Sequence, residues 1–379
     1  MSTAFENSIL SDGSRAQSAT TGYLIGPVWD FLVLGGGSIL PLLLVMYWWP
    51  QGADTTPLLA STLLVANLIN HPHFAHSYQL FYRDFRARGF GDRFPASLRW
   101  RYLFAGILVP LLLAAFFAYC IATRDTLLLG RAVNLMLFLV GWHYVKQGYG
   151  MLMVDAVLKR NFFDPADKRW LLVNAYAVWI TSWLLVNRTL AVHNYWDLKY
   201  YTFGIPDSMM WLAWLIVSAT TALMLRVMWK KLSAWRHKTV PLNGAIAYLV
   251  SLYLWLLVRH PAMLLVIPAF HSLQYLAVVW RYRLNIERQT DADQRRLFRG
   301  RGPWPGFALF LFLGTVLGYL GFWMAPMYLD SWVDYDKALF GGALFMFIFW
   351  IFINIHHYFL DNVMWRKNNP DTRRYLFGG

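Results

Sequence analysis

The feature that most constrains this 379-residue chain is a succession of apolar segments, each long enough to cross a bilayer as a helix. Such a helix needs about 20 mainly apolar residues, because every backbone N–H and C=O must be hydrogen-bonded inside the hydrocarbon. We find ten segments of this kind, at residues 27–49, 57–82, 100–121, 130–157, 170–188, 209–229, 241–258, 261–280, 304–325 and 338–362. The sequence therefore predicts an all-α fold, a polytopic membrane helical bundle of about ten transmembrane helices.

Composition leads to the same fold class. Hydrophobic residues make up 58% of the chain and charged residues only 14%, whereas a soluble domain carries roughly 25% charged residues. No loop is long enough for a separate soluble domain. We expect a polar cytoplasmic N-terminal tail at residues 1–22, one transmembrane helical domain at 23–366 and a basic cytoplasmic tail at 367–379.

The net charge is +14, and the positively charged residues follow the pattern that a membrane topology would require. Arginine and lysine cluster in every second loop, beginning with the loop at 83–101, and the loops between are poor in both. By the positive-inside rule, the basic loops and both termini are cytoplasmic, so we do not expect nucleic acid as a partner. Residues 1–22 show no cleavable signal peptide. We expect a bacterial inner (cytoplasmic) membrane protein with both termini inside.

Seven of the ten histidines fall inside the predicted spans. A polar side chain in hydrocarbon is costly unless something compensates it. Six of the seven lie 7 to 12 residues before the first cytoplasmic arginine of their span, roughly 10–18 Å deep at about 1.5 Å per residue. The remaining one, His143, lies 16 residues before Lys159 and is therefore deeper, unless its helix extends beyond the membrane. The seven predicted metal ligands are His71, His73, His76, His143, His271, His356 and His357.

Spacing within each helix refines this prediction. His73 and His76 are three residues apart and share a helix face, whereas the adjacent His356 and His357 diverge by about 100°. A further polar group follows about one turn after a histidine in each histidine-bearing span. We expect these groups to orient the imidazoles or to act as additional ligands: Gln79, Gln147, Gln274 and Asp361.

The histidines also have simpler interpretations. A histidine in a membrane helix can serve as an interhelical hydrogen-bonding group, or it can bind haem. Asp30, Lys146 and Asp155 could pair with one another or line a proton path. The segment His76-Ser77-Tyr78-Gln79 resembles His271-Ser272-Leu273-Gln274, which is a weak sign of an internal repeat.

The types of donor side chain restrict which metal could bind. The single Cys120 excludes an intrachain disulfide and cysteine-rich clusters. Imidazole with carboxylate or amide suits iron, copper or zinc. Because the histidines outnumber the four donors of tetrahedral zinc, we expect two metal ions, or one octahedral iron.

The closely spaced His73 and His76 and the pair His356-His357 resemble, as short motifs only, the integral-membrane histidine-box non-haem diiron oxygenases, which include fatty-acid desaturases and hydroxylases. The first cluster here is HxHxxH, and Phe352 and Ile353 precede His356 where that family has histidine or glutamine. Membrane carotenoid-cleaving iron oxygenases are a comparable likeness. The resemblance implies two irons that activate dioxygen, with His143 and His271 as further ligands.

On this basis we expect a metal-dependent oxidoreductase that desaturates, hydroxylates or cleaves a lipid or other hydrophobic substrate entering from the bilayer. Electrons would come from a cytoplasmic donor docking on the basic loops, because the chain has no Gly-rich dinucleotide fingerprint. Two alternatives stay open. One is a haem-binding or quinone-linked electron-transfer protein, and the other is a proton-coupled transporter.

Overall fold

The computed structural model describes residues 22–37, 56–189, 194–233, 240–256, 263–290 and 298–378. Within these ranges the chain is almost entirely helical, as predicted. The only strands in them are β1 (Asn194–Tyr195) and β2 (Leu198–Lys199), which form an antiparallel hairpin. His193, His237 and His260, which we did not expect to bind metal, lie outside the described residues.

The helical elements follow one another through the described ranges. In order they are α2 (Pro27–Phe31), η1 (Leu32–Gly36), α4 (Thr56–Val65), η2 (Ala66–Asn70), α5 (His71–Tyr82), α6 (Phe85–Gly89), α7 (Ala96–Leu103), η3 (Phe104–Leu108), α8 (Val109–Ala122), α9 (Thr126–Leu158), α10 (Pro165–Thr189), α11 (Asp207–Ser233), α12 (Leu242–Tyr253), η5 (Leu254–Leu256), α13 (Met263–Gln289), α14 (Trp304–Tyr319), η7 (Leu320–Met324), α15 (Ala325–Trp332), α16 (Lys337–Phe340), α17 (Leu344–Met364), α18 (Pro370–Thr372) and η8 (Arg373–Phe377).

Six helices in the described part of the chain are long and apolar enough to span a membrane. They are Ala96–Ala122, Thr126–Leu158, Pro165–Thr189, Asp207–Lys231, Trp304–Trp332 and Leu344–Met364. The other four predicted spans are also helical wherever the structure describes them, at α2–η1, α4–α5, α12–η5 and α13. Ten spans and cytoplasmic termini stay predictions.

The tenth span begins later than predicted. Its helix α17 starts at Leu344 rather than at residue 338, because a short helix, α16, ends at Gly341. Gly341 has a φ of 78°, the left-handed region that glycine adopts at little cost. Asp336 caps α16 by accepting a hydrogen bond from the Leu339 amide.

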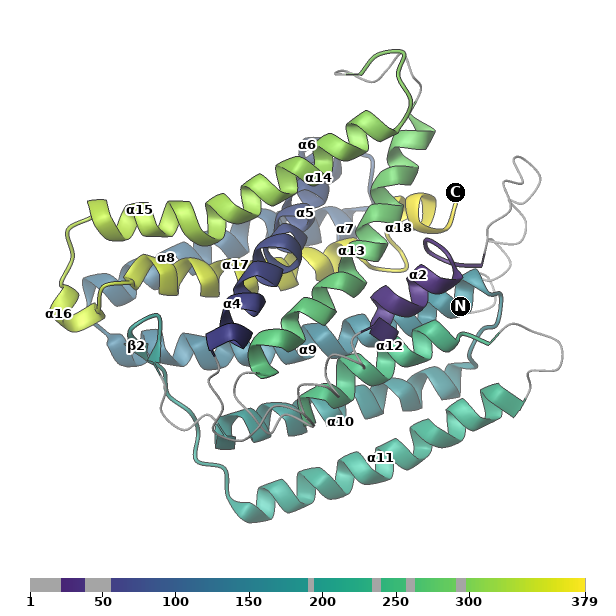
Figure 1. The fold of residues 1–379 in the computed structure, drawn as a ribbon, viewed down its shortest axis with the longest axis horizontal. Coiled ribbons are helices and arrows are strands. Elements are labelled where there is room, and N and C mark those ends of the chain that lie inside the picture. Colours follow the sequence, from purple (N-terminus) through teal and green to yellow (C-terminus); the bar gives the residue numbers. More distant parts are fainter. Residues whose placement is uncertain are drawn as a thin grey trace.

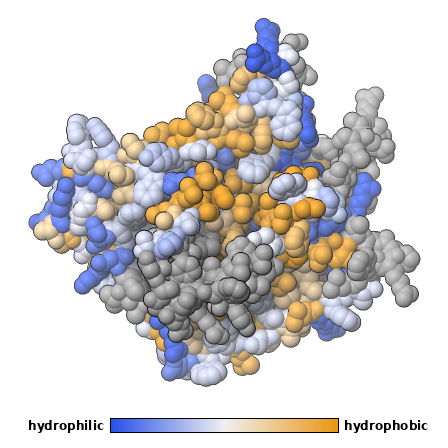
Figure 2. All heavy atoms as spheres, in the orientation of Figure 1, coloured by the Kyte–Doolittle hydropathy of each residue, from blue (hydrophilic) through white to orange (hydrophobic). Residues whose placement is uncertain are grey.

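The long helices lie roughly side by side along the long axis of the molecule (Figure 1). Helices α10 and α11 form one edge, and α14 with α15 lies along the opposite edge. Helices α4–α5 and α13 cross obliquely between them, through the middle of the bundle. Apolar side chains cover much of the central surface in the view of Figure 2, and hydrophilic ones gather mainly toward the two ends of the long axis.

The segment predicted as a basic tail packs against the bundle. Asn369, Asp371, Thr372, Tyr375 and Leu376 are all buried. Tyr375 and Leu376 belong to the same hydrophobic cluster as core residues of α5, α13 and α17. The C-terminal residues up to Phe377 are therefore part of the helical body.

Candidate metal centre

Four buried histidines from four different helices meet in the middle of the bundle. They are His73 on α5, His143 on α9, His271 on α13 and His357 on α17. The most exposed of them, His143, shows 6% of its surface. Elements far apart in sequence therefore contribute one side chain each to a single buried cluster.

The four imidazoles form a closed ring. Ring centroids lie 4.8 Å apart for His73 and His357, and 4.9 Å apart for His357 and His143. The other two distances are 4.8 Å from His143 to His271 and 5.5 Å from His271 to His73. One ligand atom from each of His73, His271 and His357 can be chosen so that all three lie within 4.8 Å of one another. This spacing is close to the roughly 4 Å between opposite donors of one ion that binds nitrogen at about 2.1 Å.

Asp361 completes the cluster from the same face of α17 as His357, one turn later. Its Oδ2 lies 3.3 Å from Nε2 of His357 and 3.7 Å from Nε2 of His143. Its other oxygen, Oδ1, accepts hydrogen bonds from the Tyr275 hydroxyl at 2.8 Å and the Ser77 hydroxyl at 3.4 Å. The carboxylate is thus held by one oxygen and presents the other to the imidazoles.

Five ring nitrogens of the four cluster histidines lack hydrogen-bond partners in the described part of the chain. They are Nε2 of His73, His143 and His357, and both ring nitrogens of His271. Leaving a buried polar atom unsatisfied costs about 1–3 kcal/mol, and here several such atoms belong to one cluster of imidazoles. A bound cation would satisfy one nitrogen of each imidazole, so the donor set fits a metal ion.

The outward nitrogens of two ligands are fixed by the protein. Nδ1 of His73 lies 2.5 Å from the Asn70 carbonyl oxygen and 3.0 Å from the Ser272 hydroxyl. Nδ1 of His357 lies 2.8 Å from the Ser77 hydroxyl oxygen. A proton on Nδ1 that is donated outward leaves a lone pair on Nε2 for the centre, which is how metal-binding histidines are usually oriented.

Aromatic side chains close the cluster off. Tyr144 stacks on His271 with ring centroids 3.8 Å apart, and Tyr358 lies 4.8 Å from His143. Tyr275 lies edge-on to both His73 and His357. These rings exclude water from the imidazoles and restrict their rotation.

Three of the seven predicted ligands lie outside this cluster. His71 stacks on Phe322 at 4.3 Å, and His76 stacks on Phe310 at 4.3 Å. His356 places Nδ1 2.8 Å from the Tyr78 hydroxyl and Nε2 2.9 Å from the Ala105 carbonyl oxygen. His76 and His356 therefore make the kind of local contact expected of histidines that join helices.

The packing of α14 on α5 explains why His71 and His76 point away. Gly314 and Gly318 of α14 let the two helices approach closely, because a Cβ at Gly314 would lie 2.1 Å from Cε1 of His76. A Cβ at Gly318 would lie 2.8 Å from the backbone carbonyl carbon of His71. Small residues four apart are a common device for close helix contact in membranes. His73 is turned about 60° from His76 around α5, and it faces α13 and α17 instead.

His143 lies in the cluster although it is farther from its basic loop than the other histidines. Its helix α9 has 33 residues, about 50 Å at 1.5 Å per residue, which exceeds a hydrocarbon core of about 30 Å. This length agrees with the alternative that α9 extends beyond the membrane.

The three predicted glutamines contact the histidines differently from Asp361. Oε1 of Gln79 lies 2.8 Å from Nδ1 of His76, outside the cluster. Gln147 donates to the backbone oxygen of His271 at 2.8 Å and to Oε1 of Gln274 at 3.2 Å. Gln274 donates to the Leu34 carbonyl at 2.7 Å. Gln147 and Gln274 thus fix the backbone around His271 rather than its imidazole.

The polar groups considered for a proton path make separate contacts. Asp30 accepts hydrogen bonds from the amides of Leu24, Ile25 and Gly26. Asp155 pairs with Lys159 at 2.9 Å, one turn along the same helix. The Lys146 ammonium lies over the Tyr176 ring. Each has a local role, and these contacts do not join the three groups to one another.

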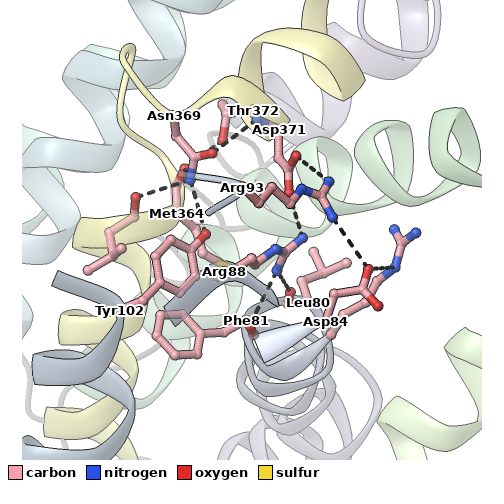
Figure 3. Close-up of polar contacts among 12 residues, drawn as sticks. Leu80, Phe81, Asp84, Arg88, Arg93, Tyr102, Met364, Asn369, Asp371 and Thr372 are labelled. Atoms are coloured by element: carbon pink, nitrogen blue, oxygen red, sulfur yellow. Dashed lines mark hydrogen bonds and ion pairs between the residues drawn. The ribbon is translucent and has the colours of Figure 1, made fainter. Parts of the chain in front are cut away.

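A buried polar network holds α5 and α17 together at the ends nearest the basic loops (Figure 3). Arg88 donates to the carbonyl oxygens of Leu80 and Phe81 at the end of α5 and to Oδ2 of Asp371 at 2.8 Å. Arg93 donates to Oδ1 of the same carboxylate at 2.7 Å. This network joins the helix of His73 to the segment that follows the helix of His357.

Ser77, Ser272 and Tyr275 support the site and were missed as functional residues. The repeated His-Ser-x-Gln segment is the sequence signal that could have identified the two serines as part of the site. In each copy the serine contacts a cluster histidine of another helix: Ser77 contacts His357, and Ser272 contacts His73. Tyr275 carried no comparable signal in a chain rich in aromatic residues.

No known protein family matches this chain, and neither does any curated protein or any solved structure. The functional argument therefore depends on the residues of the cluster themselves.

Proposed function

We propose that this protein is a membrane-embedded, metal-dependent oxidoreductase that activates dioxygen at a histidine-ligated iron centre. Its substrate would be a lipid or other hydrophobic molecule, which it desaturates, hydroxylates or cleaves after entry from the bilayer. The observation that carries the proposal is the ring of four buried imidazoles with unpartnered nitrogens, adjoined by one carboxylate. The bundle would have ten spans, with both termini in the cytoplasm.

Of the two possibilities left open by the sequence, two metal ions or one octahedral iron, the donor count favours one iron. The two candidate ligand groups, His73/His271/His357 and His143/His357/Asp361, share His357. One imidazole nitrogen binds a single ion, so two ions would leave one of them with two protein donors. Five donors exceed tetrahedral zinc but suit an iron with one open position.

In this proposal each group has a definite task. His73, His143, His271 and His357 would hold the metal, and Asp361 would contribute a negative charge from Oδ2. Ser77, Ser272 and Tyr275 would keep the ligands oriented, and the tyrosine rings would exclude water. The iron, when bound, supplies the activation of dioxygen that an unactivated C–H bond requires. Electrons would come from a cytoplasmic donor that docks on the basic loops.

Haem is less well supported than a bare ion. A porphyrin would have to lie between two axial imidazoles and displace their neighbours, whereas here each imidazole is within 5.5 Å of two others, centroid to centroid. An optical spectrum separates the two possibilities, because haem gives an intense Soret band. Such a band in purified protein would contradict the proposal.

The decisive experiment is elemental analysis of purified protein together with single variants. We expect about one iron per chain, reduced strongly in His73→Ala, His143→Ala, His271→Ala and His357→Ala. His356→Ala is the matched control, since it removes the neighbouring imidazole without touching the cluster, and His76→Ala is a second one. Equal metal loss in the controls, or folded wild-type protein without metal, would contradict the proposal. Lipid profiles of cells with and without the protein would then identify the substrate class.

A further inference from the structure

A groove lies on the outer side of α17, away from the histidine cluster. It has a volume of about 430 Å³ and runs between α7–η3 and α17. Its walls include Ser97, Trp100, Arg101, Phe104, Phe359 and Asn362. On a helix, Phe359 lies about 200° from His357, so the groove is separate from the metal centre. The Ala105 carbonyl, which accepts the contact from His356, belongs to a lining residue of the groove.

The groove is polar at one end and apolar at the other. Ser97 lies at the start of α7, Arg101 in its last turn and Asn362 near the end of α17, on the side of the basic loop at 83–95 and the C-terminal segment. Phe104 and Phe359 lie deeper along the same two helices, with ring centroids 6.0 Å apart. The exposed Trp100 is of the type that gathers at the membrane interface. This gradient matches an amphiphile with its head at the basic end.

The polar end carries positive charge without a carboxylate to balance it. Arg83, Arg88, Arg93, Arg99 and Arg283, at the same end of the bundle, all pair with acidic side chains. Arg101 has neither an ion pair nor a side-chain hydrogen bond within the described ranges. Arg366 follows the lining residue Val363 by three positions, and burial together with the charge of Arg101 lowers the pKa of its guanidinium. The positive charge of Arg101 on the groove wall, which no carboxylate balances, favours an anion there.

We propose that this groove binds one anionic phospholipid, with its phosphate at Arg101 and an acyl chain along Phe104 and Phe359. Basic pockets between membrane helices on the cytoplasmic side recognise anionic headgroups in this way. The lipid would cover a gap beside α17 and so support the helix that carries His357. It would be a bound structural lipid rather than the substrate, since α17 separates it from the cluster.

Native mass spectrometry of the full chain in detergent tests the proposal. The probes are phosphatidylglycerol, phosphatidylcholine and inorganic phosphate. We expect retention of one phosphatidylglycerol, not displaced by phosphate, with phosphatidylcholine bound more weakly. Arg101→Gln should weaken phosphatidylglycerol binding by about fivefold. Asn362→Trp should weaken it by filling the groove while leaving every charge in place.

Arg86→Gln is the control, because Arg86 is an exposed arginine near the same basic loop that does not line the groove. It should leave lipid binding unchanged. Equal effects of Arg86→Gln and Arg101→Gln would show diffuse attraction and overturn the proposal. Unchanged binding in Asn362→Trp, or equal retention of the two lipids, would also overturn it. Metal content should be unaffected in all three variants, which keeps this test separate from that of the proposed function.

Discussion

The hydroxyl oxygen of Ser77 lies 2.8 Å from Nδ1 of His357, although 280 positions separate the two residues in sequence. The same hydroxyl lies 3.4 Å from Oδ1 of Asp361, to which it donates. One small side chain on α5 therefore orients two cluster residues on α17. Its position makes a first prediction possible.

Ser77→Ala should weaken metal binding without removing any ligand. Loss of a group that orients a metal-binding histidine typically costs 10- to 100-fold in affinity, so we expect about that range. Chelator competition with purified protein measures the change. Ser61→Ala is the control, because Ser61 is exposed and bonds only the Pro57 carbonyl on the same helix. Equal affinity of Ser77→Ala and wild type would mean that Ser77 does not position His357.

Asp361→Asn should lower metal affinity while the protein stays folded. The amide keeps the size of the carboxylate and can still accept from Tyr275 and Ser77, but it removes the charge that faces His143 and His357. Chelator competition and a thermal melt of the metal-free protein separate the two effects. If the substitution changed only the melting temperature and not the metal affinity, Asp361 would have a structural role alone.

Removing the metal should lower the stability of the wild-type protein. The ion would join α5, α9, α13 and α17, and a ligand that binds only the folded state stabilises it in proportion to the logarithm of its concentration over Kd. The melting temperature should fall on treatment with a chelator and recover when iron is restored. In His357→Ala, the melting temperature should be the same with chelator as with iron. A chelator effect as large in His357→Ala as in wild type would place the ion elsewhere.

Arg88→Met should destabilise the bundle strongly. Arg88 and Asp371 form a buried ion pair, and their side chains expose only 2% and 5% of their surface. Removing one partner of such a pair costs about 3–5 kcal/mol. Arg86→Gln, at an exposed position, should change stability by less than about 0.5 kcal/mol. Denaturation in detergent measures both, and similar stabilities of the two variants would contradict the role given to Arg88.

Gly318→Ala should separate α14 from α5. The new Cβ would lie 2.8 Å from a backbone carbon of His71, which cannot move aside as a side chain could. Overpacking of this kind costs about 1–3 kcal/mol. Gly321→Ala is the matched control, since its Cβ would meet only Cδ1 of Ile353 at 3.5 Å, an ordinary contact. Equal thermal stability of the two variants would show that the close approach at Gly318 is unimportant.

Several features of the fold were predictable because they depend on local sequence. An apolar segment of about 20 residues forms a helix in a membrane whatever its neighbours are. The helical class and the six long apolar helices of the described part of the chain followed from this rule, whereas the short helices α6 and α18 did not. The start of α17 did not follow, since it depends on the turn at Gly341, where a Cβ would lie 2.6 Å from Cβ of Asp197 in the β1–β2 hairpin.

The candidate site was predictable only in part. Helical geometry anticipated that His356 and His357 would face different neighbours and that Asp361 would lie beside His357. It also placed His73 and His76 on one face. Those two side chains still diverge by about 60°, and α5 lies between α14 on one side and α13 and α17 on the other. Because of that difference, His76 packs against Phe310 whereas His73 lies in the cluster.

The sequence by itself thus determined the helical class, the long apolar helices and which of the predicted spans carry imidazoles, because length, apolarity and helical spacing are properties of each segment alone. Only the tertiary structure decided that His73, His143, His271 and His357 converge while His71, His76 and His356 do not. The physical reason is that the surroundings of a side chain depend on which helix packs against each face. That packing is governed by distant residues, such as Gly314 and Gly318, that the histidine pattern does not include.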